Sequence, residues 1–186
     1  MKEKIYPNSL NIFITERCNL NCKYCFVTKE LKNSKLTFFD LKKAIDLLLD
    51  FPGNIKTFSF NGGEPLLEFP LVKKTIIYAL KKAKEKNQHL NIAVMTNGTL
   101  LSKDIVNFLV KNQIIVKISI DGKKEIHDKQ RPFLETPEKS SYETILKNLR
   151  HFPPQYPHFC ASLVFTPETV HSLFQNIKFL HQLGFP

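Results

Sequence analysis

The sequence lacks several features that would place it outside the ordinary globular proteins. No apolar run approaches the ~20 residues that a transmembrane helix needs, so no membrane span is expected. Residues 1–7 contain no apolar signal core, so a reducing cytoplasm is the expected compartment. No linker or low-complexity segment interrupts the 186 residues, and this length predicts one domain with a sizeable core.

Tryptophan is absent and acidic residues are in the minority. Phenylalanine occurs 16 times, mostly at strand and helix-face positions, so we interpret it as core filling rather than as a stacking surface. The 17 Asp and Glu stand against 27 Lys and Arg, which gives a net charge of +10. The lysines of residues 73–86 alternate with apolar positions, as on a solvated outer helix face. No pattern of interleaved aromatic and basic residues indicates RNA binding, so a nucleic-acid partner is not favoured.

Cysteine is scarce, but three of the four copies lie close together as Cys18, Cys22 and Cys25. An odd number of thiols cannot pair internally as disulfides. Tetrahedral zinc requires a fourth ligand, yet the next cysteine is Cys160 and the first histidine is His89. A four-iron cluster held by three cysteines keeps one iron open to a small molecule. The spacing therefore favours an iron–sulfur cluster, with a zinc knuckle or a redox-sensing thiol group as alternatives.

Five short segments rich in Ile, Val and Phe each precede a loop and a helical pattern. This alternation predicts a parallel sheet of βα units with the helices outside. Right-handed connections would curl five such units into an open half-barrel, so the expected fold class is α/β, a partial (β/α)6-type TIM-like barrel. The expected strands are residues 10–15, 56–60, 90–95, 114–120 and 159–165, with helices capped at Thr37, Ser102 and Ser140 and a last helix ending at Gly184.

Polar clusters follow the second and third expected strands, at the strand ends where barrels of this kind carry their chemistry. Gly62, Gly63 and Glu64 follow the second strand. The glycines would let a ligand approach the backbone, and the carboxylate suits an ammonium group. Thr96 and Asn97 follow the third strand. An ordinary strand-to-helix turn explains the first segment equally well. For the second segment a turn is the favoured interpretation, because Asn-Gly is the commonest of turn dipeptides.

Another polar cluster follows the fourth expected strand. Ser119 and Arg131 would converge there, and a hydroxyl and a guanidinium suit ribose hydroxyls and a carboxylate. We interpret His127 and Asp128 as a surface turn or helix cap. Cys160, in the fifth strand, is interpreted as a small buried apolar side chain rather than as a cluster ligand or a radical-relay thiol.

Several of these motifs together resemble one enzyme family. The Cys-x3-Cys-x2-Cys spacing, with Tyr24 before the third cysteine, resembles the cluster motif of the radical S-adenosylmethionine (SAM) enzymes. Residues 62–65 resemble the GGEP motif of that family, and residues 96–98 resemble a segment at the end of its third strand. The stretch from Ser119 to Arg131 is similar to that of the SPASM group, which includes anaerobic sulfatase-maturating enzymes and peptide maturases.

The resemblance implies a cofactor and a reaction. Cys18, Cys22 and Cys25 would hold a 4Fe-4S cluster whose open iron binds SAM. Cleavage of SAM by an electron from the cluster would give a 5′-deoxyadenosyl radical that abstracts hydrogen from a peptide or protein substrate. A flavodoxin or ferredoxin would donate the electron. The residues implied in SAM binding are Tyr24, Gly62, Gly63, Glu64, Thr96, Asn97, Ser119 and Arg131.

The sequence departs from this resemblance in two ways. Cores of the family usually have six βα units, and SPASM members carry auxiliary clusters on further cysteines, yet no cysteine follows Cys160. We therefore expect residues 1–186 to be an incomplete core domain that lacks the sixth unit and any auxiliary-cluster domain. A radical SAM enzyme acting on a nucleotide or RNA, and a non-catalytic metal-binding fragment, stay open as alternatives.

Overall fold

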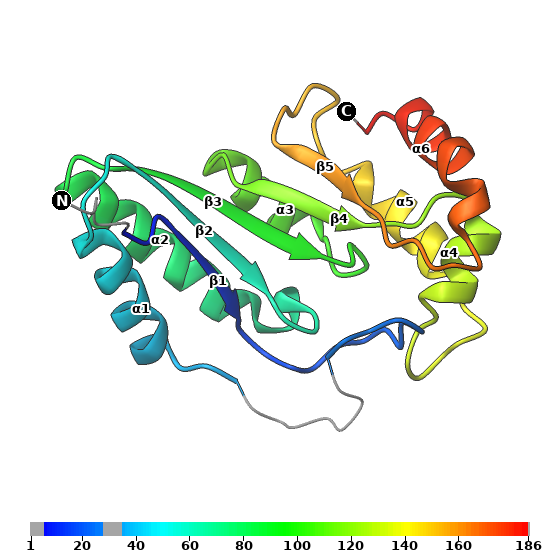
Figure 1. The fold of residues 1–186 in the computed structure, drawn as a ribbon, viewed down its shortest axis with the longest axis horizontal. Coiled ribbons are helices and arrows are strands. Elements are labelled where there is room, and N and C mark those ends of the chain that lie inside the picture. The colour runs from blue at the N-terminus through cyan, green and yellow to red at the C-terminus, as the bar shows by residue number, and fades with distance from the viewer. Residues whose placement is uncertain (1–5, 28–34, 186) are drawn as a thin grey trace, which may run out of the picture.

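The chain forms one sheet of five parallel strands in the order β1-β2-β3-β4-β5 (Figure 1). The computed structural model describes residues 6–27 and 35–185. Of residues 1–7, in which the sequence shows no signal core, the first five lie outside the described residues. This architecture confirms the expected α/β class and the partial barrel. The strands are β1 (Ser9–Phe13), β2 (Ile55–Asn61), β3 (His89–Thr96), β4 (Ile115–Ser119) and β5 (Phe159–Ser162).

A helix follows each strand, as the sequence predicts, but two helices follow β4 where one was expected. Thr37 begins the first helix with a capping box, in which its Oγ1 accepts from the Asp40 N–H at 3.3 Å and the Asp40 carboxylate accepts from the Thr37 N–H at 2.9 Å. Gly184, with φ of +93°, lies just beyond the last helix. The helices are α1 (Phe38–Asp50), α2 (Phe69–Glu85), α3 (Lys103–Lys111), α4 (Lys124–Gln130), α5 (Ser141–Leu149) and α6 (Leu173–Gln182), with 3-10 turns η1 (Pro65–Glu68) and η2 (Val170–Ser172).

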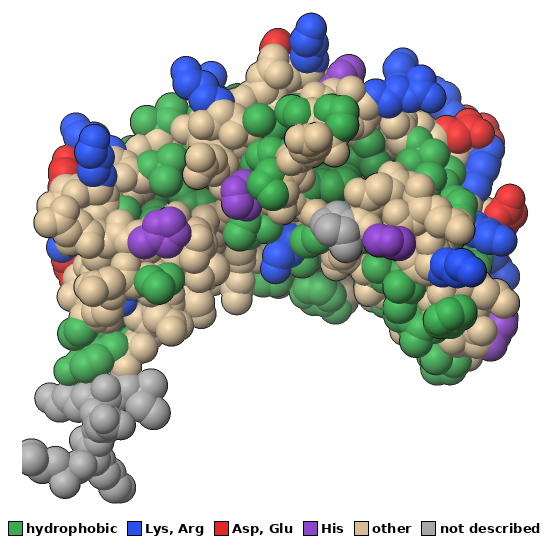
Figure 2. All heavy atoms as spheres, turned by 90° about the horizontal axis from the view of Figure 1, so that it is seen from above, with side chains coloured by type: hydrophobic (Ala, Val, Ile, Leu, Met, Phe, Trp, Pro, Cys, Tyr) green, Lys and Arg blue, Asp and Glu red, His purple; other side chains and the backbone are tan. Residues whose placement is uncertain are grey.

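The two faces of the sheet differ in burial. Side chains of the outer face, such as Phe58, Phe60 and Val94, are fully buried and form the hydrophobic core together with apolar side chains of the helices. On the inner face, Ser59, Met95 and Lys117 alternate with them and stay partly exposed. Figure 2 shows the molecule as an arch around one hollow side, as expected of an unclosed barrel. The inner face is therefore the accessible face of the sheet.

Two sequence interpretations are wrong in this region. Cys160 is half-buried on the inner face opposite Lys117, not packed in the core, because its strand places alternate residues toward the hollow. His127 is fully buried rather than at the surface, because the polar stretch after β4 folds into α4 and packs against α5. The cap interpretation holds for Asp128, which accepts from the Tyr142 N–H at 3.0 Å and the Ser140 hydroxyl at 2.7 Å at the start of α5.

The described helices are all too short or too polar to cross a membrane.

Candidate functional site

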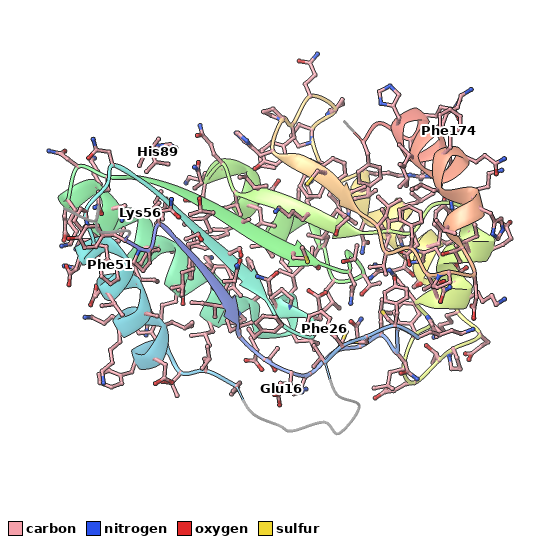
Figure 3. The ribbon with its side chains drawn as sticks, viewed as in Figure 1. Glu16, Phe26, Phe51, Lys56, His89 and Phe174 are labelled. Carbon is pink, nitrogen blue, oxygen red and sulfur yellow. The ribbon has the colours of Figure 1, made fainter. Side chains whose placement is uncertain are left out.

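A cavity of about 470 Å³ lies at the carboxyl ends of the strands, beside the cysteine loop. Figure 3 shows Glu16 and Phe26 at this end of the sheet, with Lys56 and His89 at the opposite end. All the site residues that the sequence predicts line this cavity except Glu64. The predicted residues in its wall are Cys18, Cys22, Cys25, Tyr24, Gly62, Gly63, Thr96, Asn97, Ser119 and Arg131.

The glycines after β2 hold the start of the cysteine loop. The Gly63 N–H donates to the Thr15 carbonyl, and the Glu64 N–H donates to the Arg17 carbonyl, each at 2.8 Å. A Cβ on Gly63 would lie 2.2 Å from the Arg17 oxygen, and one on Gly62 would lie 2.4 Å from the Thr15 oxygen. Both positions therefore require glycine because two backbones meet there.

The Glu64 carboxylate, which the sequence predicts to receive an ammonium group, is absent from the cavity lining and is bonded within the chain. It is fully buried, with Oε1 accepting from the Thr96 hydroxyl at 2.7 Å and the Leu66 N–H at 2.9 Å. Its Oε2 accepts from the Asn97 N–H at 2.7 Å. Burial raises the pKa of Glu64 to about 7, although these hydrogen bonds oppose the rise. The side chain thus joins the ends of β2 and β3.

The Asn97 side chain contacts the cysteine loop, including the first cysteine. Its Nδ2 donates to the Asn19 Oδ1 at 2.8 Å and lies 3.8 Å from the Cys18 sulfur. The Leu20 N–H also approaches this sulfur, at 3.4 Å. Burial raises the pKa of the Cys18 thiol to about 11, so in the protein alone this group carries its proton. Two donors are nevertheless placed to stabilise a thiolate there once a metal displaces that proton.

The cysteine loop is also paired with the segment that follows α4. The Asn21 N–H donates to the Pro132 carbonyl at 2.8 Å, and the Lys23 N–H donates to the Gln130 carbonyl at 2.9 Å. Leu20 and Phe133 form an antiparallel bridge in the same register. These contacts fix Cys22 on a short two-stranded ribbon instead of a free loop. The local sequence around the cysteines gave no sign of this partner.

Asp121 is a buried site residue that the sequence reasoning missed. The Arg131 Nε and Nη2 donate to its two oxygens at 2.9 and 3.0 Å, and the Tyr24 hydroxyl donates to Oδ2. The Val164 N–H donates to Oδ1 at 3.1 Å. The Nε and Nη2 groups of Arg131 are therefore already bonded to a carboxylate of the protein and are not free to bind a carboxylate of a ligand. Its signal in the sequence was a charged residue directly after a buried strand, which an Asp-Gly turn equally explains.

Arg131 also affects the second cysteine. Burial raises the pKa of the Cys22 thiol, and the nearby Arg131 guanidinium partly opposes this rise. The same guanidinium lies over the Tyr24 ring, with its carbon 5.2 Å from the ring centroid. Cys25 is exposed, with its N–H donating to the Cys22 carbonyl at 3.2 Å.

The donor set fits an iron–sulfur cluster better than a single ion. Over residues 6–27 and 35–185, no three His, Cys, Asp or Glu side chains group closely enough to hold one metal ion. In a cluster each thiolate binds a different iron, so its ligands stand farther apart than those of one zinc. Three sulfur donors in the wall of one cavity meet this requirement.

A comparison with protein-family models shows which family the chain belongs to. The family model described as the radical SAM superfamily matches residues 12–180. The chain belongs to the radical SAM superfamily. This membership identifies it as a domain of an enzyme.

Relatives of this radical SAM domain include maturation enzymes. It is 35% identical to an uncharacterised protein of Methanocaldococcus jannaschii over 92% of this chain and 57% of that one. It is 33% identical to the cysteine-type anaerobic sulfatase-maturating enzyme of Clostridium novyi over 73% of this chain and 37% of that enzyme. The chain spans about half the length, or less, of the curated relatives it matches.

A solved structure agrees with the whole described fold. The structure of native anSMEcpe with bound AdoMet and the Kp18Cys peptide superposes with a TM-score of 0.85 at 27% identity. The superposition covers 97% of this chain and 49% of anSMEcpe.

Proposed function

We propose that the radical SAM domain binds a 4Fe-4S cluster through Cys18, Cys22 and Cys25, binds SAM in the adjoining cavity, and serves a peptide- or protein-modifying enzyme. One observation carries this proposal: a single cavity is lined by the three thiols and by the ends of β2, β3 and β4. When bound, the cluster and SAM supply a 5′-deoxyadenosyl radical that abstracts hydrogen from the substrate. A flavodoxin- or ferredoxin-like donor and a reducing cytoplasm complete the proposal.

The chain's own residues divide into those that meet SAM and those that position others. The Gly62 and Gly63 backbone, the Tyr24 segment and the Ser119 hydroxyl line the cavity and are proposed to contact SAM directly. Thr96 and Asn97 also line it, but their side chains are bonded to Glu64 and Asn19, so they shape the cavity more than they recognise a ligand. Glu64 is proposed as a positioning residue for the same reason.

The lining of the cavity favours a peptide over a polyphosphate. Among the described lining residues, Arg131 is the only cation, and Asp121 already neutralises it. Apolar side chains such as Phe13, Phe26 and Val164 make up much of the rest of the wall. A nucleoside triphosphate requires several free cations or a metal at its phosphates. The sulfatase-maturating relative and the peptide bound in anSMEcpe support the same substrate class.

Anaerobic reconstitution tests the cluster. We expect the wild-type chain to take up four irons per chain and to show a reduced-cluster signal in electron paramagnetic resonance. Substitution of Cys18, Cys22 or Cys25 with Ala removes a ligand, so each variant should fail to assemble the full cluster. Cys160→Ala is the matched control and should reconstitute like the wild type, because Cys160 lies on β5 outside the cavity lining. A full 4Fe-4S signal from any of the first three variants would refute the ligand assignment.

The net charge of +10 favours a second candidate, a radical SAM enzyme that acts on RNA or a nucleotide. Filter binding to RNA at two salt concentrations separates the candidates, because phosphate contacts give a steep salt dependence. We expect weak binding without saturation. Saturable binding that weakens steeply with salt would instead support RNA or a nucleotide as the substrate.

A further inference from the structure

Cys22 and Arg131 lie directly opposite each other on the ribbon that pairs the cysteine loop with the segment after α4. The hydrogen bonds from Asn21 to Pro132 and from Lys23 to Gln130 flank this pair on both sides. Directly opposed residues in an antiparallel pair project from the same face, with Cβ atoms about 5 Å apart. Both side chains line the cavity. A guanidinium therefore lies beside the second cysteine sulfur.

The orientation of this guanidinium is fixed by its other neighbours. Asp121 binds it through Nε and Nη2, and the Tyr24 ring covers one of its faces. The Tyr24 hydroxyl donates to the same carboxylate, so the three side chains form one closed unit. A guanidinium has five N–H groups, and Asp121 takes two of them. The remaining donors lie on the edges that Asp121 does not occupy.

We propose that Arg131, oriented by Asp121 and Tyr24, is a positioning residue for the Cys22 sulfur. Its remaining N–H groups hold the Cys22 thiolate in place as a cluster ligand and stabilise the reduced cluster. Positive charge and hydrogen bonds at a cluster sulfur favour the more negative, reduced state and so raise the reduction potential. This inference rests on the proposed cluster. It replaces the sequence-based expectation that Arg131 binds a carboxylate of SAM.

The test variant is Asp121→Asn combined with Arg131→Gln. Removing both charges together leaves no unpaired buried ion and keeps the local net charge unchanged. The wild type and the variant are reconstituted anaerobically without SAM, and the midpoint potential of the cluster is measured by redox titration with paramagnetic resonance detection. Iron per chain is measured in the same samples. We expect a more negative midpoint potential, or a loss of iron from a folded chain.

Two further variants separate this effect from a general loss of structure. Arg150→Gln removes an exposed arginine at the end of α5 and should leave the potential and iron content unchanged. Arg131→Lys keeps the ion pair with Asp121 but lacks the fork, so it should shift the potential in the same direction by a smaller amount. This variant decides the question if the double variant does not fold.

The outcomes distinguish this inference from the proposed function. A wild-type potential and full iron in the double variant would overturn the inference while the cluster assignment stands. Weaker SAM binding at an unchanged potential would also overturn it and would assign Arg131 to the cofactor. A wild-type chain that assembles no cluster would overturn the proposed function and this inference with it.

Discussion

The imidazole of His127 is buried in the contact between α4 and α5, and it accepts a hydrogen bond at Nδ1 from the Asp121 N–H at 3.3 Å. Acceptance at Nδ1 requires the neutral ring with its proton on Nε2. Among the described residues, Nε2 has no hydrogen-bond partner. Burial, with a smaller contribution from Arg131, lowers the pKa of His127 to about 4. Protonation of this ring therefore opposes the fold.

His127 should make the free energy of unfolding depend on pH. Between its ordinary pKa near 6.5 and about 4, the unfolded chain binds more protons than the folded one, so stability falls as pH falls through this window. The loss approaches about 3 kcal/mol below pH 4. Urea unfolding at pH 7.5 and 4.5 measures it. His127→Asn keeps an acceptor near the Nδ1 position but does not titrate, so it should show a smaller pH dependence. An equal dependence in both proteins would rule out His127 as the cause.

The sequence predicted ten of the residues that line the cavity, because motif spacing fixes residue types in the cysteine loop and at the strand ends. It could not find the directions of their side chains. Glu64 and Arg131 were expected to face a ligand, yet both are bonded to other side chains of the chain. Whether a charged side chain meets a ligand or a protein partner depends on distant residues. Asn97 lies 33 positions from Glu64 and Asp121 lies ten positions from Arg131, and local patterns do not report them.

At the scale of elements, the turn after β2 acts as the anchor of the cysteine loop. Gly63→Ala would place a methyl group against the Arg17 backbone, and neither backbone can yield without breaking the hydrogen bonds at Thr15 and Arg17. We expect a loss of roughly 2 kcal/mol or more in the free energy of unfolding. We also expect lower iron content after reconstitution, because the displaced loop carries Cys18. Urea unfolding and iron analysis measure the two effects.

Gly184→Ala is the matched control for that substitution. Gly184 has a positive φ but nothing within 4 Å of an added Cβ, so this change costs only the backbone strain of about 1 kcal/mol. Iron content should stay at the wild-type value. If Gly63→Ala behaved like this control, the close approach at Arg17 would be unimportant for the cysteine loop.

The order and type of the strands followed from the apolar segments, but their ends did not. β5 was expected to reach residue 165 and ends at Ser162. The Val164 N–H donates to the Asp121 side chain instead of continuing the ladder, and Pro167 lies just beyond. α4 was missed because it is polar and only seven residues long, and its stability comes from packing His127 against α5. Both differences come from long-range contacts.

At the scale of the whole molecule, the open sheet predicts a gradient of local stability. β3 has eight residues, lies between two strands and is largely buried, whereas β5 has four residues, pairs with β4 on one side in the described structure, and is only half-buried. Backbone amides of β3 should exchange with solvent only on global unfolding, and those of β5 by smaller openings. Native-state hydrogen exchange measures this difference. Equal protection of the two strands would contradict the gradient.

The ribbon between residues 19–23 and 130–134 has a consequence for the order in which the domain is made. At about 5–20 residues per second, the partner segment is synthesised roughly 5–20 seconds after the cysteines. During that interval Cys22 has no Arg131 opposite it, and the three thiols belong to a growing, unpaired chain. Iron delivery to the proposed cluster is therefore expected to follow translation of residues 130–134, although the three cysteines are synthesised about a hundred residues earlier.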